Sequence, residues 1–458
     1  MSVADAVQAY HHLLEADPAL ARASAALLAD QQGPRHLTFG GRALCKTLRP
    51  QLIARSQYAE IQRVCHLLAQ AMFRLGRQML DEPALLAEID PTDGERRLLT
   101  PHPGYQEVSP TSRLDSFVCG GSWQFVEYNA ESPAAIAYED GLADLFLGLP
   151  VMRRFQEAHT VAPLYARHRL VEALRDTYAQ FQRSYPQAAV APESPTIAIV
   201  DWSNLPTATE FELFRAYFEQ QGLRAVIVEP AALDYDGRRL RAEGLEVDLV
   251  YRRVLTSELL MRPHDAEALI RAYEDGHVCV VNSFRAKLLH KKMTFALLSD
   301  DRYQHRFTAE QWAICQRHIP WTRKVREGYT TYNGGRVDLL NFVARNRHTL
   351  VLKPNDDYGG KGVVIGWETS DGAWSAALTG ALSDSFVVQE RVAVTKEPYP
   401  LYDLETGSLS FADLAADLDP FLFNTEVTGV LTRLSSAALL NVTAGAGSTA
   451  PTFVLEGV

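Results

Sequence analysis

The chain has 458 residues, of which 47% are hydrophobic and 22% are charged, and its formal net charge is −11 at pH 7. This length allows two or three domains around a sizeable core. The acidic balance argues against nucleic-acid binding, which needs a basic face. No long apolar run predicts a membrane span, no leader sequence is recognisable, and the 5 scattered cysteines form no CxxC pair. We therefore expect a cytoplasmic globular protein with no nucleic-acid or membrane partner.

Four segments follow one another along the chain. Residues 1–95 carry apolar side chains at a helical period, which predicts a helical N-terminal region with no visible chemistry. Residues 96–190 contain a predicted strand pair and a helix, and end in a proline-rich boundary. Residues 195–285 alternate strand and helix, which indicates a Rossmann-like parallel sheet. Residues 286–458 return to a mixture of helices and strands.

The strand pair of the second segment carries a candidate metal-binding pair. The strands are predicted at 113–118 and 123–129, and Glu127 and Asn129 stand two positions apart, so both side chains point to the same face. A carboxylate and an amide oxygen on one face can bind a hard cation such as Mg²⁺. The alternative is an ordinary polar face exposed to solvent.

Polar residues follow the predicted strands of the third segment. Asn204 lies in the loop after the strand at 196–201, and Arg253 follows the strand at 248–251. Ligands of parallel sheets bind beyond the carboxyl ends of the strands, and arginine can bind a carboxylate through two hydrogen bonds. A surface ion pair is the alternative for the arginine. No GxGxxG occurs, so no dinucleotide site is predicted.

A glycine-rich hairpin in the fourth segment is the central candidate for a functional site in this sequence. Two apolar strands flank the connection 353–362, which contains lysines, three glycines, Asp356 and Asp357. Backbone N–H groups of such a turn approach an anion closely because no Cβ blocks them. Together with the lysines and carboxylates, this is the chemistry of a nucleoside triphosphate with Mg²⁺. A plain hairpin with a polar loop is the alternative, and the Walker A pattern is absent.

Three further features flank the hairpin. A helix predicted over 287–298 carries Lys291 and Lys292, and one of the two must face inward if it is to bind phosphate. The strand at 386–392 has the alternation of a strand that lines a cleft. Near the C-terminus Arg433 follows an apolar strand, and the small polar loop that comes next is either a lid over a substrate or a mobile tail.

These separated motifs together resemble the ATP-grasp superfamily, and most closely its circularly permuted branch, which includes eukaryotic-type glutathione synthetases and glutathionylspermidine synthase-like ligases. The resemblance runs in the same order from about Arg113 to the C-terminus. It implies an α/β (α+β) ATP-grasp fold with a Rossmann-like substrate domain. It also implies an enzyme that uses ATP and Mg²⁺ to join a small-molecule carboxylate to an amine through an acylphosphate, and it allows a homodimer.

The resemblance implies roles for individual residues. The metal ligands would be Glu127, Asn129 and Asp357. The nucleotide would be bound by Lys292 (with Lys291 as the alternative), Lys353, Asp357, Gly359, Gly360, Lys361, Gln389 and Glu390. Lys292, Lys353 and Arg433 would act in catalysis. The substrate side would comprise Arg113, Asn204, Arg253, Arg433 and the lid residues Ala444, Gly445 and Ala446.

The sequence also departs from the glutathione synthetases. Asp357 stands where they have a glutamate, and Tyr358 precedes the glycine pair where they have a third glycine. The resemblance therefore predicts a ligase without specifying glutathione as its product. Two other functions remain open at this point, an ATP-grasp phosphotransferase and a nucleotide-binding module without catalysis.

Overall fold

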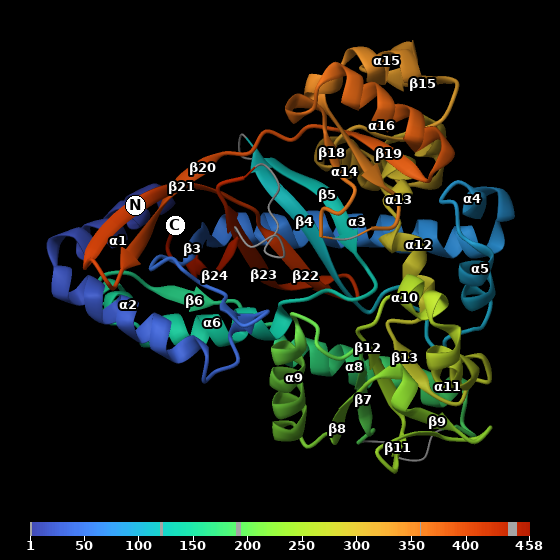
Figure 1. Cartoon of the computed structure of the whole chain (residues 1–458), viewed down its shortest axis with the longest axis horizontal. Coiled ribbons are helices and arrows are strands. Elements are labelled where there is room, and N and C mark those ends of the chain that lie inside the picture. Colours follow the sequence, from blue (N-terminus) through green and yellow to red (C-terminus); the bar gives the residue numbers. More distant parts are fainter. Residues whose placement is uncertain (1, 120–121, 189–193, 358, 438–446) are drawn as a thin grey trace.

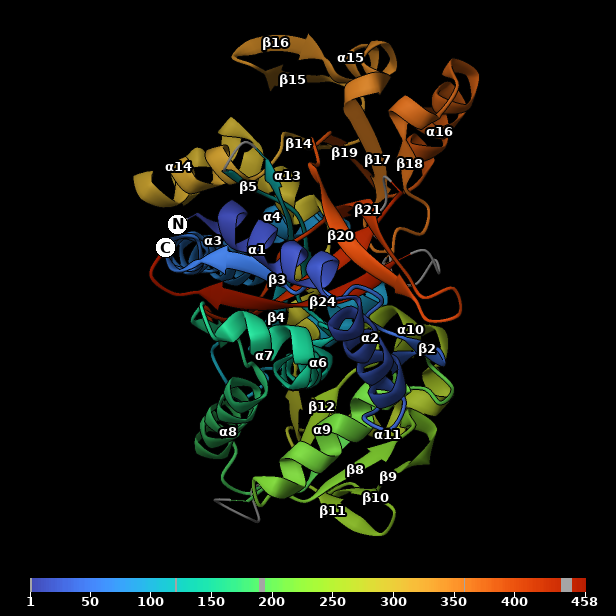
Figure 2. The ribbon, with the colours of Figure 1, turned by 90° about the vertical axis from the view of Figure 1, so that its left-hand side faces the viewer.

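The computed structural model describes residues 2–119, 122–188, 194–357, 359–437 and 447–458. A large, mainly antiparallel sheet occupies the middle of the molecule, with a parallel-sheet unit at one end and a smaller antiparallel unit at the other (Figures 1 and 2). Within the described part of the chain, no helix is both long and apolar enough to cross a membrane.

The central sheet has nine strands among the described residues, in the order β20-β21-β23-β22-β4-β5, with β24 pairing with β23, β3 and β6. These strands are β3 (Gln51–Ala54), β4 (Thr111–Cys119), β5 (Ser122–Asn129), β6 (Val161–Pro163), β20 (Lys396–Asp403), β21 (Ser408–Ala416), β22 (Asp419–Phe423), β23 (Glu426–Ser435) and β24 (Ser448–Leu455). The expected hairpin is β4 and β5, which pair antiparallel with a register shift after Asp115.

The two faces of the central sheet are covered by different helices because side chains alternate along each strand. Helix α3 (Arg55–Asp81) packs on one face, where Leu422 and Val454 join its core cluster. Helices α6 (Ile136–Gly148) and α7 (Pro150–Gln156) pack on the other, where Phe453 lies among their apolar residues. The burial of both faces fixes which residues of each strand point inward.

The N-terminal region is more than the helical region that its periodicity predicts. It does contain helices α1 (Val3–Ala16), α2 (Pro18–Gln32), α3, α4 (Pro83–Ala87) and α5 (Asp93–Leu99). It also contains the short pair β1 (Thr38–Phe39) and β2 (Arg42–Ala43), and β3, which runs parallel to β24 at the far end of the chain. The beginning of the chain is therefore part of the central sheet.

The parallel-sheet unit confirms the Rossmann-like pattern. Its strands β7 (Ile197–Val200), β8 (Ala225–Val228), β12 (Leu249–Arg252) and β13 (Cys279–Val281) are all parallel, in the order β13-β12-β7-β8. One face packs against α8 (Arg167–Ser184) and α9 (Ala208–Gln220), and the other against α11 (Pro263–Glu274). The unit is completed by α10 (Thr256–Met261) and the small sheet of β9 (Leu233–Tyr235), β10 (Leu240–Ala242) and β11 (Leu245–Val247).

The third unit contains the glycine-rich hairpin. Its sheet has the order β14-β19-β17-β18, built from β14 (Thr322–Lys324), β17 (Leu350–Pro354), β18 (Val364–Ile365) and β19 (Phe386–Glu390). All three pairings are antiparallel, and the expected hairpin is β17 and β18. Helices α15 (Leu339–Arg345) and α16 (Asp371–Ser383) cover this sheet, and β15 (Tyr329–Tyr332) pairs with β16 (Gly335–Asp338) at its edge.

The single helix predicted over 287–298 is wrong, because the structure breaks it into α12 (Lys287–His290) and α13 (Met293–Ser299). The break is stabilised from the glycine-rich hairpin. The backbone N–H of Lys292 donates to the carbonyl of Asn355 at 2.9 Å, and that of Met293 donates to Asn355 Oδ1 at 2.9 Å. The buried asparagine thus replaces helical hydrogen bonds that continuous periodicity would have supplied. Helix α14 (Ala309–His318) follows further along.

Gly429 lies within β23 with a positive φ of 87°. Its Cα lies close to other segments of the same chain. A Cβ at this position would lie 2.8 Å from the Cβ of Ala166 and 3.3 Å from the ring of Phe421. We expect Gly429→Ala to lower the free energy of unfolding by roughly 2–4 kcal/mol, since backbone strain and overpacking add. The matched control is Gly222→Ala, where φ is 76° and nothing lies within 4 Å of the added Cβ. Its cost should be only about 1 kcal/mol, and equal losses in chemical denaturation would contradict the packing argument.

Candidate functional site

One cavity of about 770 Å³ brings most of the predicted site residues together. Its walls come from the β4–β5 hairpin, the strand ends of the parallel sheet, the glycine-rich hairpin, β19 and β23. The predicted residues that line it are Arg113, Glu127, Asn129, Arg253, Lys292, Lys353, Asp357, Gly359, Gly360, Lys361, Gln389, Glu390 and Arg433. Phe39 and Leu44 also line it, so the N-terminal region, in which no chemistry was expected, contributes to the wall.

Lys353 on β17 is held inside the cavity by uncharged oxygens. Its Nζ donates to Gln389 Oε1 at 2.6 Å and to the carbonyl of Val126 at 3.3 Å. The Gln389 amide in turn donates to Thr322 Oγ1 at 3.0 Å. Burial lowers the pKa of Lys353 to about 8, although Glu127 nearby favours its charged form. The hydrogen bonds of the Lys353 ammonium are therefore made to uncharged oxygens and not to carboxylates.

The two adjacent lysines at the helix break point in different directions. Lys292 lines the cavity, where its Nζ lies 3.4 Å from Glu127 Oε1 and donates to the carbonyl of Asp357. Lys291 instead pairs with Glu95 at 3.1 Å and lies 3.6 Å from Asp356. Of the two lysines that the sequence left open, Lys292 is thus the one that lines the cavity.

The expected metal-binding pair on β5 has a carboxylate opposite it that the sequence analysis did not include. In the β4–β5 register, Asp115 pairs with Glu127, and Arg113 pairs with Asn129. Asn129 Nδ2 donates to Asp115 Oδ1 at 2.8 Å, which directs the amide nitrogen toward β4. Asp115 lines the cavity together with Glu127 and Asn129. This wall therefore offers two carboxylates and one amide.

Arg433 is surrounded by aspartates. Its Nη2 lies 2.7 Å from Asp115 Oδ2 and 2.7 Å from Asp417 Oδ2. The same nitrogen lies 2.8 Å from Asp419 Oδ2. Arg113 makes a second, two-pronged pair with Asp115, at 2.8 and 3.1 Å. The guanidinium predicted to bind a substrate carboxylate is thus already paired with three carboxyl groups of the protein.

The buried acids behind Arg433 differ in their titration. The two arginines hold the pKa of Asp115 below its usual range, in spite of burial. Burial raises the pKa of Asp417 to about 6 and that of Asp419 further, although Arg433 opposes both shifts. Burial also raises the pKa of Glu139, a buried carboxyl close enough to Asp417 and Asp419 to be affected by their charges. Burial thus favours the uncharged form of these carboxyls, which limits the repulsion among them.

Sequence reasoning missed these acids, although two local signals were present. Arg113 and Asp115 stand two positions apart in one strand, and Asp417 and Asp419 have the same spacing where the chain enters the next strand. In strands this spacing puts charges on one face, and a buried face with two acids needs a basic partner face. The register of β22 against β4, where Phe421 pairs with Arg113, is what brings the two pairs together.

The strand ends of the parallel sheet form another part of the wall. Arg253, after β12, donates to the carbonyl of Pro133 at 2.6 Å and to Tyr251 Oη at 3.2 Å. Its distance to Glu210 Oε2 is 3.8 Å, and its Nε has no hydrogen-bond partner among the described residues. Asp201, after β7, lines the cavity as well, and burial raises its pKa to about 7.

Asn204 is not among the cavity-lining residues of the described chain, unlike the other predicted substrate-side residues that are described. It is exposed, with a φ of 60°, and its amide contacts Ser203 Oγ at 3.3 Å. The neighbouring residues Leu205 and Thr207 reach the wall instead. The lid residues Ala444, Gly445 and Ala446, and Tyr358 in the glycine-rich loop, lie outside the described residues.

The side of the cavity near β17–β19 is apolar. Glu390 lies at its edge, where its Oε1 accepts a hydrogen bond from Tyr332 Oη at 2.8 Å. The apolar residues on this side are Val351, Val363, Ile365, Trp367, Val392 and Val394. An apolar slot next to lysines suits a ligand with a flat ring at one end and anionic groups at the other.

Comparisons with known proteins bear on the class of protein. No protein-family model matches the chain. A stretch of 203 residues is 30% identical to a Frankia alni protein named as a glutamate–cysteine ligase, covering 40% of this chain and 21% of that protein. An uncharacterized protein of Mycobacterium leprae is 25% identical over 344 residues, covering 72% of this chain and 56% of that protein. The chain thus spans about a fifth of the first relative and just over half of the second.

A solved structure matches over nearly the whole length of both chains. It is a glutathione synthetase-like effector from Globodera pallida, with a TM-score of 0.60, 13% sequence identity, and coverage of 96% of this chain and 98% of that one. A sequence identity of 13% supports a shared fold and not a shared function. The chain therefore has an α/β ATP-grasp fold of the glutathione synthetase-like type, which confirms the fold expected from its motifs.

The depressed pKa of Lys353 predicts a pH dependence of stability. A lysine with a folded pKa of about 8 and an unfolded value of 10.5 binds fewer protons when folded, so its contribution to stability rises with pH between those values. We expect wild-type protein to gain roughly 1–3 kcal/mol relative to Lys353→Met over this window. Urea denaturation of both proteins at several pH values measures the difference. A difference that stays flat from pH 7.5 to about 10.5 would contradict the assigned pKa.

Proposed function

We propose that the protein is an ATP- and Mg²⁺-dependent ligase that joins a carboxylate to an amine through an acylphosphate. The observation that carries the proposal is the distribution of charge in one cavity. The ammonium groups of Lys292 and Lys353 lie beside a glycine-rich turn and an apolar slot, and Arg253 lies at the strand ends of the parallel sheet. The first arrangement suits a nucleoside triphosphate, and the second suits a smaller carboxylate substrate.

The names of similar proteins point the same way. The Frankia alni relative is named as a glutamate–cysteine ligase, and the Globodera pallida structure as a glutathione synthetase-like effector. The first name is that of a ligase that joins two amino acids, and the second is that of a protein likened to a synthetase. Because the match to the first covers 21% of that protein, the activity of this chain rests on the arrangement of its own residues.

The residues where β5 faces the glycine-rich loop fit Mg²⁺. Glu127 and Asn129 on β5 and Asp357 in the loop offer carboxylate and amide oxygens, which are the ligands that this cation prefers. The Lys292 ammonium lies against Glu127 and the carbonyl of Asp357, so this position is already arranged around a positive charge. Bound there, Mg²⁺ would neutralise charge on the phosphates and hold them in line for transfer.

The protein's own residues would act mainly by position and charge. A substrate carboxylate oxygen attacks the γ-phosphorus while the bond to the β-phosphate oxygen breaks, and an amine then forms the amide as phosphate leaves. Lys353 and Lys292 stabilise the negative charge on the transferring group, and amides of Gly359 and Gly360 add to them. An anion beside Lys353 would also favour its charged form, reversing the effect of burial.

Among the three arginines on the substrate side, Arg253 is the best placed to bind the substrate carboxylate. Arg433 and Arg113 already hold aspartates at 2.7–3.1 Å. Arg253 has its nearest carboxylate, Glu210, at 3.8 Å. A ligand carboxylate therefore displaces little when it pairs with Arg253, whereas at Arg433 it competes with three acids. We assign Arg113 and Arg433 to the shape and charge of this wall.

The direct test is ADP release with a panel of amino acids and amines, with product masses determined for each pair that reacts. A ligase releases one ADP per amide formed and needs both substrates. Lys353→Met should lower kcat/KM for ATP roughly 30- to 1,000-fold, since a charge-assisted contact to phosphate is lost. Lys46→Met changes an exposed lysine and serves as the control. A phosphorylated acid without amide would identify a phosphotransferase, and ATP binding without turnover would identify a noncatalytic module.

Glu127→Gln tests the metal assignment separately. The change keeps the size of the side chain and its place opposite Asp115 in the sheet but removes the charge. We expect the Mg²⁺ concentration for half-maximal turnover to rise roughly 10- to 100-fold while the melting temperature stays near that of wild type. Glu426→Gln, on β23, changes an exposed strand glutamate in the same way and is the control. An unchanged Mg²⁺ requirement in Glu127→Gln would rule this residue out as a ligand.

A further inference from the structure

A group of buried charges lies next to the cavity, where α12 passes between the parallel-sheet unit and the glycine-rich hairpin. Lys287 begins α12, and Lys291 directly follows the end of this short helix, one helical turn further along. They face the carboxylates of Glu95, Glu131 and Asp356. The sequence motifs name Lys291 and Asp356 separately and do not connect them, because the members of the group are far apart along the chain.

Lys287 is the centre of this group. Its Nζ lies 3.0 Å from Glu131 Oε2, is in direct contact with Asp356 Oδ1, and lies 3.9 Å from Glu95 Oε1. Lys287 and Glu131 are 1% and 0% exposed, so this pair is shielded from water. The desolvation that opposes the charge of Lys287 is outweighed by Glu131 and Asp356, which raise its pKa. The ammonium therefore bridges two carboxylates.

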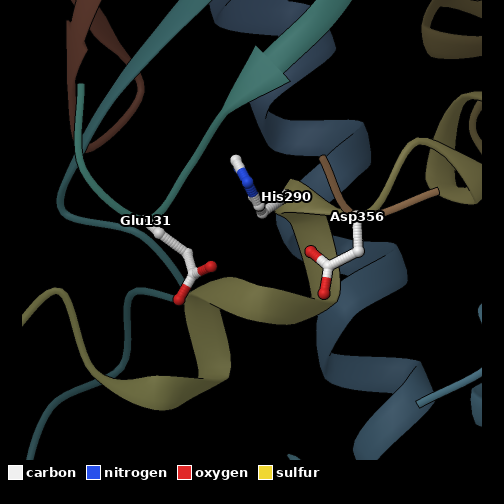
Figure 3. A group of neighbouring side chains, drawn as sticks. All are labelled: Glu131, His290 and Asp356. Atoms are coloured by element: carbon white, nitrogen blue, oxygen red, sulfur yellow. The ribbon is translucent and has the colours of Figure 1, made fainter. Parts of the chain in front are cut away.

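Figure 3 shows Glu131 and Asp356 facing one another below His290. Ligand atoms of these three residues lie within 4.8 Å of one another, which is the spacing of a metal site. The Lys287 ammonium, however, already contacts both carboxylates. Burial lowers the pKa of His290, so the imidazole is uncharged at neutral pH. The geometry is accordingly that of an ion-pair bridge with lysine as its cation.

On one side the bridge is anchored in the parallel-sheet unit. Glu131 Oε1 accepts hydrogen bonds from Arg252 Nη1 at 3.1 Å and from the Thr256 backbone N–H at 3.2 Å. Arg252 ends β12 and directly precedes Arg253, which lines the cavity. Glu131 also follows Asn129 by two positions, close to the proposed metal ligands. Its carboxylate thus connects the end of β12, where Arg253 lies, to the end of β5, where the proposed metal ligand Asn129 lies.

On the other side the bridge holds the beginning of the glycine-rich loop. Asp356 immediately precedes Asp357, whose carbonyl accepts a hydrogen bond from Lys292. Beyond it, Gly359 and Gly360 both have positive φ values, of 63° and 74°. Glycine adopts positive and negative φ about equally readily, so these residues do not by themselves fix the conformation of the loop. A loop of this kind needs an external anchor if its amides are to meet a phosphate in a fixed geometry.

We propose that Lys287 and Asp356 are positioning residues that fix the glycine-rich loop for Mg²⁺–nucleotide binding by tying it to Glu131. This inference rests on the proposed function, since it concerns the same nucleotide. It assigns neither residue a contact with the nucleotide. The physical basis is that a buried pair resists separation, because removing one partner leaves the other charge buried without compensation.

The experiment measures the dissociation constant of Mg²⁺–ADP by calorimetry for the full chain, with the melting temperature measured in parallel. The principal variant is Asp356→Asn, whose side chain is 24% exposed and therefore tolerates the change. The matched control is Glu95→Gln, which removes a carboxylate from the same group that contacts Lys291 and not the loop. Asp356→Asn should weaken Mg²⁺–ADP binding roughly 10- to 100-fold, as loss of a supporting partner does. Glu95→Gln should lower the melting temperature with no such loss of binding.

Steady-state kinetics and a double variant complete the test. Asp356→Asn should raise KM for ATP and leave KM for the carboxylate substrate unchanged. The double variant Lys287→Met/Asp356→Asn should bind Mg²⁺–ADP no more weakly than the weaker-binding of the two single variants. The reason is that each substitution breaks the same contact, the one between Lys287 and Asp356. If Lys287→Met does not fold, Asp356→Asn and its control decide. Wild type that fails to bind Mg²⁺–ADP would refute the proposed function itself. Wild-type binding with unchanged affinity in Asp356→Asn, or equal losses in Glu95→Gln, would overturn this inference alone.

Discussion

The contact on which the cavity depends is that of Arg433 with three aspartates from neighbouring segments of the central sheet. Asp115 belongs to β4, Asp419 begins β22, and Asp417 directly follows the end of β21, so one guanidinium ties these three segments together. A buried charge is tolerated only when it is paired and hydrogen-bonded. The pairing therefore requires this register of strands, and a slip of one residue would turn the acids to the opposite face.

The same requirement explains why the cavity has chemically different sides. On the β23 side, Arg113 and Arg433 are both paired with carboxyl groups of the protein. Near the glycine-rich hairpin, Lys353 is held by a glutamine and a backbone carbonyl, which satisfy its hydrogen bonds without cancelling its charge. Of these three cations, Lys353 on the hairpin side is thus the one with no carboxylate paired with it within the described part of the chain, and an anion would gain most from its charge.

The sequence predicts those parts of this arrangement that local signals encode. Glycine spacing and flanking apolar strands located the β17–β18 hairpin, and the alternation of strand and helix located the parallel sheet. What it could not predict depends on partners far along the chain. Asn355 breaks the helix at Lys292, and the register of β22 against β4 brings Asp419 near Arg113 across about 300 residues. Periodicity records which face is buried and carries no information about the opposing strand.

The two buried charge groups also explain how sites from different units can form one cavity. Arg433 fixes β4 against β22 and β23, and Glu131, just after β5, connects the same hairpin to the parallel sheet through Arg252 and to the glycine-rich loop through Lys287. The β4–β5 hairpin is therefore held by two groups of buried ion pairs, one at Asp115 on β4 and one just after β5. Such pairs contribute little to net stability because desolvation offsets their attraction. Their effect is to exclude other arrangements of these segments, so that the side chains lining the cavity keep their relative positions.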